Sequence, residues 1–494
     1  MRNPIRRVCE GRASLLAGVA ASVAALVAVP SLTPVSAAPP GDEVFVSAGH
    51  VVVPGNPLIA FDISWIDPNL VEYMLADRSN AAIDVIPLIF NPPVFQIKPT
   101  GVNAFAGASP AGNDSSGPNG ILTFNDPNNP IGIQLWAGDG PTANPVCGVM
   151  SICSTVKVFA DNVSLTSTIP TFGNHRADEL CFAPPIGSGP GGRPGLIMVA
   201  NDAESPDGTS FISIIPTDTN AGANPNIVLQ KIVLPQANGI EQCGYDTTTG
   251  QFFLSIPALL GGGNGGVFIF NVGSGKTGIV SATFHQINNT AACTAPQGLA
   301  IGPRQGGSNA NGNPFNSDIL LGCNGNPGGA TGNTVTVFKG EPSTITNVYR
   351  GAGGADEVWY NDLGPAGFQG HYFVASGTPA LAGGAMFTTI IDPLLPNTGP
   401  TFNDNALDQT ITTGFKGGSA GSNHSVAAWS GTPGVGTPNA LPLLEVFAVP
   451  VIATQGPGPS QSTLCGGDAA KGCVAFFVIS PPAPFPDNSP AQNF

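Results

Sequence analysis

Two stretches of the chain, RADELCF (residues 176–182) and ADEVWYN (residues 355–361), read as copies of one structural element although they lie far apart. The same position recurs more loosely at GIEQCGY (239–245), APQGLA (295–300) and NHSVA (423–427). Similar segments that return at regular intervals are the sequence signature of a repeat architecture. We therefore expect one structural unit to be repeated along the chain.

Each copy predicts the first strand of a unit, and the chain then divides into seven units that start near residues 57, 117, 175, 238, 294, 355 and 423. Short β-branched and alternating runs bounded by Gly, Asn, Asp and Pro indicate four strands in each unit. In the third unit these runs cover residues 179–183, 195–200, 211–216 and 227–234. In the sixth they cover residues 358–361, 371–375, 385–391 and 408–412.

Four antiparallel strands in each of seven units predict an all-β fold, a seven-bladed β-propeller with four-stranded antiparallel blades. A β-sandwich array or a solenoid is the alternative, and the unit length and strand count favour the propeller. The last unit is one strand short, and EVFVSAGHVVV (43–53) precedes the first unit and resembles a strand. We expect this segment to become the outer strand of the last blade, because pairing the two chain ends removes an open edge.

The motifs also carry a family resemblance. YMLADRSNAAIDVI (73–86), the ADEL and ADEVWY starts, and HSVAAW followed by VFAVPV resemble bacterial exported propellers of the YVTN and NHL repeat type. The resemblance covers essentially the whole mature chain and implies a propeller. It leaves the activity open, because that superfamily includes binding scaffolds, lactonases and metal-dependent gluconolactonases.

The N-terminal segment is typical of a secretory signal peptide. Four arginines precede an apolar run over residues 15–29, and Val35, Ser36 and Ala37 form a small-residue cleavage site. We expect residues 1–37 to be removed, residues 38–480 to form one propeller, and residues 481–494 to form a Pro-rich tail. The pair Arg6-Arg7 leaves a twin-arginine route open. The predicted product is exported, to the periplasm or the outside of the cell, and has no membrane span.

Composition narrows the classes of partner. The formal net charge is −15, and removing the signal peptide takes it to about −18. Such a chain lacks the basic surface that binds phosphate backbones, so we expect no nucleic acid partner. Apolar residues make up 42% of the sequence, which is enough for a core, while 66 Gly and 49 Pro indicate many turns.

Eight cysteines remain after the signal peptide, and an even number in an exported chain predicts disulfides. Sequence proximity and repeat position favour four pairs, which are Cys147 with Cys153, Cys181 with Cys243, Cys293 with Cys323, and Cys465 with Cys473. A metal site built from cysteines is the rival interpretation, and the absence of any CxxC pair argues against it.

In a propeller, the starts of the innermost strands meet at one mouth of the central channel, which is the default binding site. The polar residues expected there are Asn119, His175, Asp178, Glu179, Glu241, Gln297, Asp356, Glu357 and His424. The surrounding turns add Asp77, Arg78, Asn80, Asp139, Asn201, Asp202, Asn324 and Asn326. The sequence thus predicts a polar, acidic channel mouth for an unidentified small molecule or protein.

Carboxyl groups and histidines in that set permit a divalent cation, either Ca²⁺ or a transition metal. The candidate metal ligands are His175, Glu179, Glu241, Glu357 and His424. By resemblance to gluconolactonases, the metal would polarise a lactone carbonyl and activate water. The competing interpretation is structural, and it is favoured for Asp178 and Asp356, which can fix the spacing of blades through hydrogen bonds to backbone amides.

The remaining motifs are weaker. His50, His285 and His371 fall on expected strands or outer loops, where a structural role is expected. GGSAG (417–421) matches GxSxG, and GKT (275–277) echoes a phosphate loop, but neither stands in the strand-to-helix context that its chemistry needs. The sequence therefore favours an exported binding or interaction protein, with a metal-dependent lactonase as the alternative. A subunit of a redox complex is a weaker third hypothesis, since there is no cofactor-attachment motif.

Overall fold

The structure is a computed structural model, and it describes residues 44–480 apart from a set of internal gaps. These gaps are 89–92, 126–131, 161–162, 188–191, 203–208, 218–226, 275–277, 303–317, 326–332, 351, 362–370, 379–386, 392–406, 413–424, 432–443, 454–461 and 469. The predicted signal peptide, the C-terminal tail, Asn326, His424 and the segments 275–277 and 417–421 lie outside the described residues.

The described part of the chain is all-β and consists of antiparallel sheets. Four of the sheets have four strands each, in chain order. They are β2 (Ser64–Asp67), β3 (Glu72–Asp77), β4 (Ala82–Pro87) and β5 (Phe95–Ile97); β6 (Ile121–Asn125), β7 (Ile133–Ala143), β8 (Ile152–Ala160) and β9 (Ser164–Pro170); β18 (Thr294–Ile301), β19 (Asp318–Gly325), β20 (Asn333–Phe338) and β21 (Ile345–Tyr349); and β22 (Gly354–Asn361), β23 (His371–Thr378), β24 (Phe387–Ile391) and β25 (Leu407–Thr412).

Two further sheets complete the described structure. One has eight strands, because β13 continues into contact with β15 through the pairs Ala237 with Leu259 and Asn238 with Ala258. Its strands are β10 (Ala177–Ala183), β11 (Leu196–Asn201), β12 (Thr209–Pro216), β13 (Gln230–Asn238), β14 (Cys243–Asp246), β15 (Gln251–Leu259), β16 (Asn264–Val272) and β17 (Ile279–Gln286). The other sheet, in the order β1-β28-β27-β26, contains β1 (Val44–Val51), β26 (Ala427–Gly431), β27 (Leu444–Val451) and β28 (Cys473–Ser480).

The helices within this part of the chain are short. They are η1 (Gly101–Asn103), η2 (Asn113–Ser115), η3 (Pro145–Met150), α2 (Ser462–Cys465) and η4 (Gly466–Asp468). None of these short helices has the length or the hydropathy of a membrane span.

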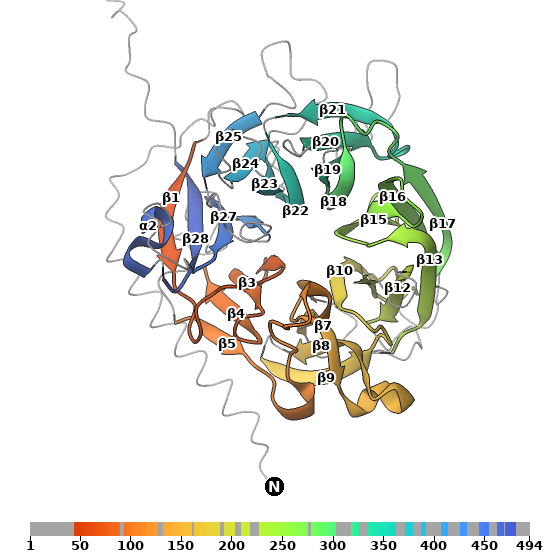
Figure 1. Cartoon of the computed structure of the whole chain (residues 1–494), viewed down its shortest axis with the longest axis horizontal. Coiled ribbons are helices and arrows are strands. Elements are labelled where there is room, and N and C mark those ends of the chain that lie inside the picture. The colour runs from red at the N-terminus through yellow and green to blue at the C-terminus, as the bar shows by residue number, and fades with distance from the viewer. Residues whose placement is uncertain are drawn as a thin grey trace, which may run out of the picture.

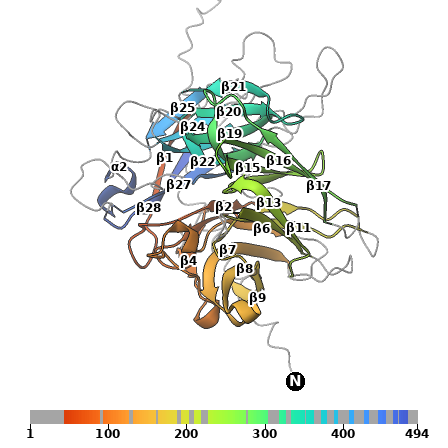
Figure 2. The ribbon, with the colours of Figure 1, turned by 45° about the vertical axis from the view of Figure 1, so that its right-hand side comes forward.

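The sheets follow one another around a common centre, as Figure 1 shows, with the colours running in chain order from β3 round to β28. Contacts between the first strands go all the way round: β2 contacts β6, and the series continues through β10, β14, β18, β22 and β26 back to β2. Figure 2 shows β9 and β21 at opposite outer sides of the molecule, with β2, β6 and β22 between them. The fold is thus a propeller-like arrangement of antiparallel sheets.

The predicted strand starts agree with this arrangement. First strands begin at Ile121, Ala177, Cys243, Thr294, Gly354 and Ala427, close to the expected positions. The first unit differs, because its first strand begins at Ser64 and the residues just after the predicted start at 57 form no strand.

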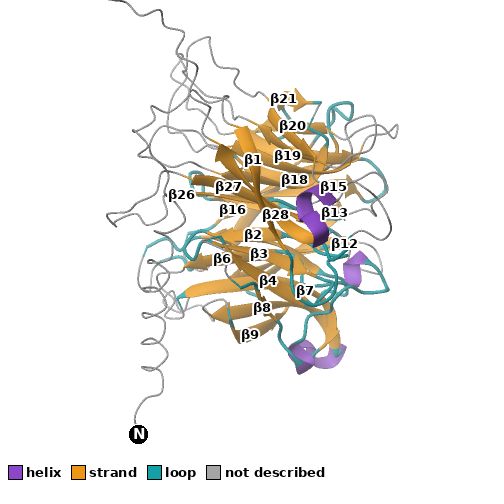
Figure 3. Ribbon diagram, turned by 90° about the vertical axis from the view of Figure 1, so that its left-hand side faces the viewer, coloured by secondary structure: helices purple, strands orange, loops and turns teal. Residues whose placement is uncertain are grey.

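The N-terminal strand lies where the missing strand was expected. β1 pairs antiparallel with β28, from Val44 opposite Ser480 to Val51 opposite Val474, at the edge of the sheet formed by the C-terminal strands. Figure 3 shows β1 beside β28. Phe45 is buried against Phe373 and Phe447, so its ring also joins β1 to the neighbouring sheet. The predicted pairing of residues 43–53 with the last unit is confirmed for Val44–Val51.

Neighbouring sheets pack closely because apolar side chains fill the space between them and glycines line their contacts. One buried cluster combines Met74 and Val85 with Ile121 and Leu135 from the next sheet. A Cβ atom on Gly120 would lie 2.2 Å from the carbonyl oxygen of Asp178. Only glycine therefore allows the first strands of these two sheets to approach so closely.

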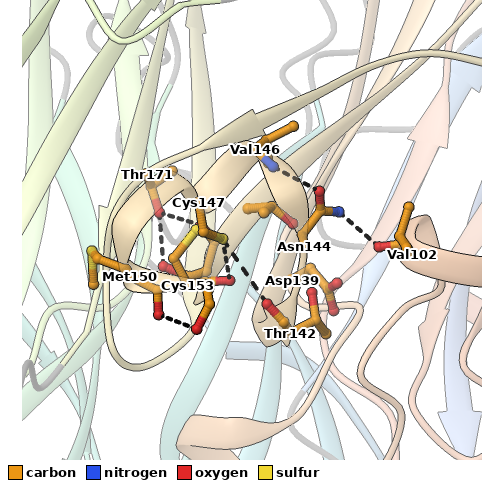
Figure 4. Close-up of a disulfide and its surroundings, with 12 residues drawn as sticks. Val102, Asp139, Thr142, Asn144, Val146, Cys147, Met150, Cys153 and Thr171 are labelled. Carbon is orange, nitrogen blue, oxygen red and sulfur yellow. Dashed lines mark hydrogen bonds between the residues drawn. A yellow bond between two sulfur atoms is a disulfide. The ribbon is translucent and has the colours of Figure 1, made fainter.

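All four predicted disulfides are present. They join Cys147 to Cys153, Cys181 to Cys243, Cys293 to Cys323, and Cys465 to Cys473. Figure 4 shows the first of these in the β7–β8 hairpin, beside Asn144, which accepts a hydrogen bond from the Val146 amide and donates one to the Val102 carbonyl. The sequence prediction of the pairing is confirmed.

Candidate functional site

A cavity of about 270 Å³ lies among the first strands of the sheets. Its walls come from β2, β6, β10, β14 and β22, or from the residue directly before one of these strands. The lining residues with polar or aromatic side chains are Trp65, Thr123, Glu179, Phe182, Gln242, Tyr245, Glu357 and Trp359. The cavity is thus central, and strands from distant parts of the chain build it.

Two carboxyl groups line this cavity, Glu179 from β10 and Glu357 from β22. Burial raises the pKa of Glu179 well above that of an exposed carboxyl group, and the neighbouring charge of Glu357 raises it further. Burial also raises the pKa of Glu357, although hydrogen bonds from Ser425 and the Val426 amide oppose the shift. Both groups therefore hold their protons to a higher pH than exposed carboxyl groups do.

The Glu179 side chain has no structural partner within the described part of the chain. The residue is 7% exposed, and no described residue donates a hydrogen bond to its carboxyl group. By contrast, Glu357 is 1% exposed and accepts a hydrogen bond from the Val426 amide at 3.2 Å. A carboxyl group that lines a cavity and has no partner in the described chain is available to a ligand.

Aromatic rings form the apolar part of the cavity lining. Trp65 and Trp359 meet edge to face with ring centroids 4.9 Å apart. Their strands, β2 and β22, are separated around the ring by β26, so the two indoles meet at the centre of the molecule. The Trp65 indole N–H donates a hydrogen bond to Thr123, which fixes the ring in the cavity wall.

Gln242 also lines the cavity, but its amide is fully used in joining strands. Its Nε2 donates to the Val358 carbonyl at 3.0 Å. Its Oε1 accepts from the amides of Leu299 at 2.7 Å and Val358 at 3.0 Å. Gln242 therefore connects the start of β14 to β18 and β22 and stabilises the wall of the cavity.

A network of buried charges occupies the same first-strand region. Arg78 pairs with Asp62 at 2.5 Å and donates two hydrogen bonds to Asn119. Arg176 pairs with Asp178 at 2.8 Å and lies 3.9 Å from Asp62. Burial raises the pKa of Asp178 well above its ordinary value, and the Arg176 guanidinium opposes that shift. These ion pairs hold the loops before β2 and β10 in fixed positions.

Two further predicted residues are adjacent. Gln297 donates a hydrogen bond to Glu241 at 3.2 Å. Burial and then the Asp356 charge raise the pKa of Glu241 well above its usual range. The structure thus brings together, around the centre, the predicted residues Asn119, Asp178, Glu179, Glu241, Gln297, Asp356 and Glu357.

Other predicted residues make contacts of their own elsewhere. His175 lies 3.6 Å from Asp114 and is not among the residues that line the cavity. Several turn residues contact neighbours within their own sheet: Asp77 with Asn80, Asp139 with Lys157, and Asn201 with Ser213. His285 pairs with Glu341 and His371 with Glu445, on β17 and β23, which agrees with the structural role expected for them.

The candidate metal ligands do not gather into a metal centre within the described part of the chain. No group of three or more His, Cys, Asp or Glu side chains there is arranged to hold a metal ion. Glu179 and Glu357 face the cavity, whereas Glu241 is bonded to Gln297 and His175 lies beside Asp114. His424, the fifth candidate ligand, lies outside the described residues, so the metal-dependent lactonase stays a sequence prediction.

Some residues of this region were not among the predicted site residues. Asp62, Arg176, Trp65 and Trp359 were absent from that set. Arg176 stands directly before the ADEL repeat start, and Trp359 stands inside ADEVWY, so the repeat motifs themselves contained the signal. Asp62 was missed because the first unit was expected to start at residue 57.

The comparisons with known proteins leave the family open. No protein-family model matches the chain, and no curated protein sequence matches it. Among solved structures it is similar to hydrazine synthase of Kuenenia stuttgartiensis, at 12% identity and a TM-score of 0.41 over 64% of this chain and 80% of that one. It is also similar to a luciferin-regenerating enzyme, at 8% identity and a TM-score of 0.36 over 89% of this chain and 95% of that one. A third is BBS1N in complex with ARL6DN, at 8% identity and a TM-score of 0.43 over 89% of this chain and 98% of that one.

The raised pKa of Glu179 predicts a pH dependence of stability. Since burial raises this pKa, the folded chain binds more protons than the unfolded chain above the ordinary carboxyl range. The contribution of Glu179 to the free energy of unfolding is therefore greatest below the pKa that this group has in the unfolded chain. It falls as the pH rises through the higher pKa that the group has in the folded chain. Glu179→Gln removes the titration, so the stability of the variant relative to wild type should rise with pH when it is measured from about pH 5 to about pH 8, by at most about 1.4 kcal/mol for each pH unit. Urea denaturation at several pH values measures this gain.

A matched control removes an exposed carboxyl group instead. Hydrogen bonds from Ser343 and His285 lower the pKa of Glu341. Glu341→Gln is therefore expected to give no gain over that pH range. If the difference in stability between Glu179→Gln and wild type does not change from about pH 5 to about pH 8, the role of burial at Glu179 is contradicted.

Proposed function

We propose that residues 38–480 form a seven-bladed β-propeller that binds a small organic ligand in its central cavity. The seven-bladed architecture is supported by the circuit of contacts between first strands, from β2 round to β26 and back to β2. The pairing of β1 with β28 supports joining of the chain ends in the last blade. The YVTN and NHL repeat type is proposed on the sequence motifs alone.

The observation that carries the binding function is the cavity and the unpartnered carboxyl group inside it. The cavity volume of about 270 Å³ suits a small molecule, and Glu179 lines it without a hydrogen-bond partner in the described chain. Ligand sites in proteins are typically concave, largely apolar, and equipped with a few converging polar groups. This cavity has each of those properties.

We place the protein outside the cytoplasm. The four disulfides support this assignment, since disulfides persist in oxidising compartments. Residues 1–37 would act as the signal peptide and residues 481–494 as a tail. The binding partner in this proposal is a small molecule, and the strongly acidic composition argues against nucleic acid.

Tryptophan fluorescence tests the binding function, because Trp65 and Trp359 line the cavity. We expect a panel of small amines, alcohols and carboxylates to contain compounds that change the fluorescence of the mature protein in a saturable way. Trp65→Phe and Trp359→Phe should each remove part of that change. Trp136→Phe should keep it, because Trp136 is fully buried and bonded to Gln134. No saturable change with any compound would overturn the proposal.

A further inference from the structure

The cavity has an excess of acidic groups that the protein itself leaves unneutralised. Glu179 and Glu357 line it, and no Lys, Arg or His is among the described residues of its wall. The nearby guanidinium groups are occupied outside the wall: Arg176 pairs with Asp178, and Arg78 pairs with Asp62. Ionising either glutamate thus places a charge in the cavity without a local counterion.

Each glutamate disfavours ionisation of the other. Their positions on β10 and β22, which are not neighbouring strands in the ring, bring the two side chains together across the centre. Two buried carboxyl groups that share one space cannot both ionise cheaply. An occupant that carries positive charge relieves the burial cost and the mutual repulsion together.

The rest of the wall favours an organic cation. Trp65, Phe182, Tyr245 and Trp359 contribute aromatic rings. A cation is attracted to the face of an aromatic ring, most strongly to Trp, and the attraction grows when water is excluded. A hard metal ion such as Ca²⁺ instead needs six to eight oxygen ligands, and this wall offers far fewer.

We propose that the cavity binds a small organic amine, whose ammonium group is held by Glu179 and Glu357 and whose apolar body packs against Trp65 and Trp359. This inference rests on the proposed ligand-binding function and adds the chemical class of the ligand. Glu179 supplies the acceptor that has no partner in the described chain, and Glu357 supplies the second charge. The apolar lining selects amines that carry a hydrocarbon group over the ammonium ion itself.

The test compares head groups on one scaffold. Isothermal titration calorimetry is run on the mature protein with 2-phenylethylamine, 2-phenylethanol and 3-phenylpropionate, and with the shorter benzylamine, benzyl alcohol and phenylacetate. We expect each amine to bind at least about tenfold more tightly than the alcohol of the same length, since a hydrogen bond to a charged group contributes more than one to a neutral group. The carboxylates should bind most weakly.

The outcomes separate the two proposals. If alcohols or carboxylates bind as tightly as the amines, the cavity is a ligand site and the assignment of an organic cation is overturned. If none of the six compounds binds, both the cavity function and the cation assignment are overturned. The series is measured on wild-type protein, so it does not depend on the folding of any variant.

Variants of matched size then test whether Glu179 supplies the negative charge that holds the ammonium group. Glu179→Gln keeps the size of the side chain and should weaken amine binding about tenfold or more while leaving alcohol binding close to wild type. Glu341→Gln removes an exposed carboxyl group outside the cavity and should leave both unchanged. An equal loss of amine and alcohol binding in Glu179→Gln would show a general packing defect and overturn the role of Glu179 in holding the ammonium group.

Discussion

Lys157→Met is expected to destabilise the protein by about 3–5 kcal/mol, because it leaves one member of a buried ion pair without its partner. Lys157 on β8 and Asp139 on β7 are both 0% exposed and are directly hydrogen-bonded. The Asp139 carboxyl group also accepts a hydrogen bond from the Ala106 amide at 3.0 Å. Burial raises the pKa of Asp139, and Lys157 opposes that shift, so removing the lysine strands a carboxyl group in the interior.

Two control variants separate the loss of the buried partner from the effect of the Lys-to-Met change itself. The double variant Asp139→Leu/Lys157→Met removes both charges and should recover most of the lost stability, as apolar replacements of buried ion pairs commonly do. Lys471→Met makes the same change in a lysine that is 64% exposed, and it should have only a small effect. Urea denaturation measures all three. If Lys157→Met unfolds at the same urea concentration as Lys471→Met, the importance of the buried pair is contradicted.

The Cys181→Ser/Cys243→Ser variant should lose about 4 kcal/mol of stability. This disulfide joins residues 62 apart in sequence, and a crosslink over a long loop restricts the unfolded chain strongly. Both cysteines also line the central cavity, where they connect β10 to β14. We therefore expect ligand affinity to fall together with stability.

A shorter disulfide provides the comparison. Cys147 and Cys153 are only 6 apart in sequence, so Cys147→Ser/Cys153→Ser should cost about 2 kcal/mol on the same chain-entropy argument. This pair lies in the β7–β8 hairpin (Figure 4) and not in the cavity wall, so ligand binding should survive its removal. Equal losses of stability and affinity in the two variants would contradict the account of Cys181–Cys243.

The repeat pattern was informative because it depends on local chemistry. Short apolar runs bounded by Gly, Asn and Pro marked the strands of each unit, and the equivalent positions of Cys181 and Cys243 predicted their bond. The shortage of one strand in the last unit likewise predicted the pairing of β1 with β28. The first unit was misplaced because residues 54–63 lead into β2 without forming a strand.

The candidate site was harder to predict because it depends on contacts between strands that are not neighbours. Glu179 and Glu357 came from the two repeat starts, so both were predicted. That Trp65 meets Trp359 across the centre depends on the number of sheets between β2 and β22 and on the direction of each side chain. Neither property is visible in the repeat motif.

The partner of a charged residue was also not visible in sequence. Asp178 was expected either to bind a ligand or to fix a loop, and the structure pairs it with Arg176 from two positions before it. Glu179, the next residue, lines the cavity instead. Two adjacent carboxyl groups at the start of β10 thus differ in role, since Asp178 forms an ion pair and Glu179 is a candidate ligand-binding group.

The central claim is that Glu179 and Glu357 hold a ligand in the cavity, and a crystal structure of the mature protein soaked with 2-phenylethylamine tests it most directly. The account predicts the ammonium group within hydrogen-bond distance of the Glu179 carboxyl group and the phenyl ring against Trp65 or Trp359. A Glu179 carboxyl group bonded to a side chain of the protein itself, with the amine elsewhere or absent, would contradict it.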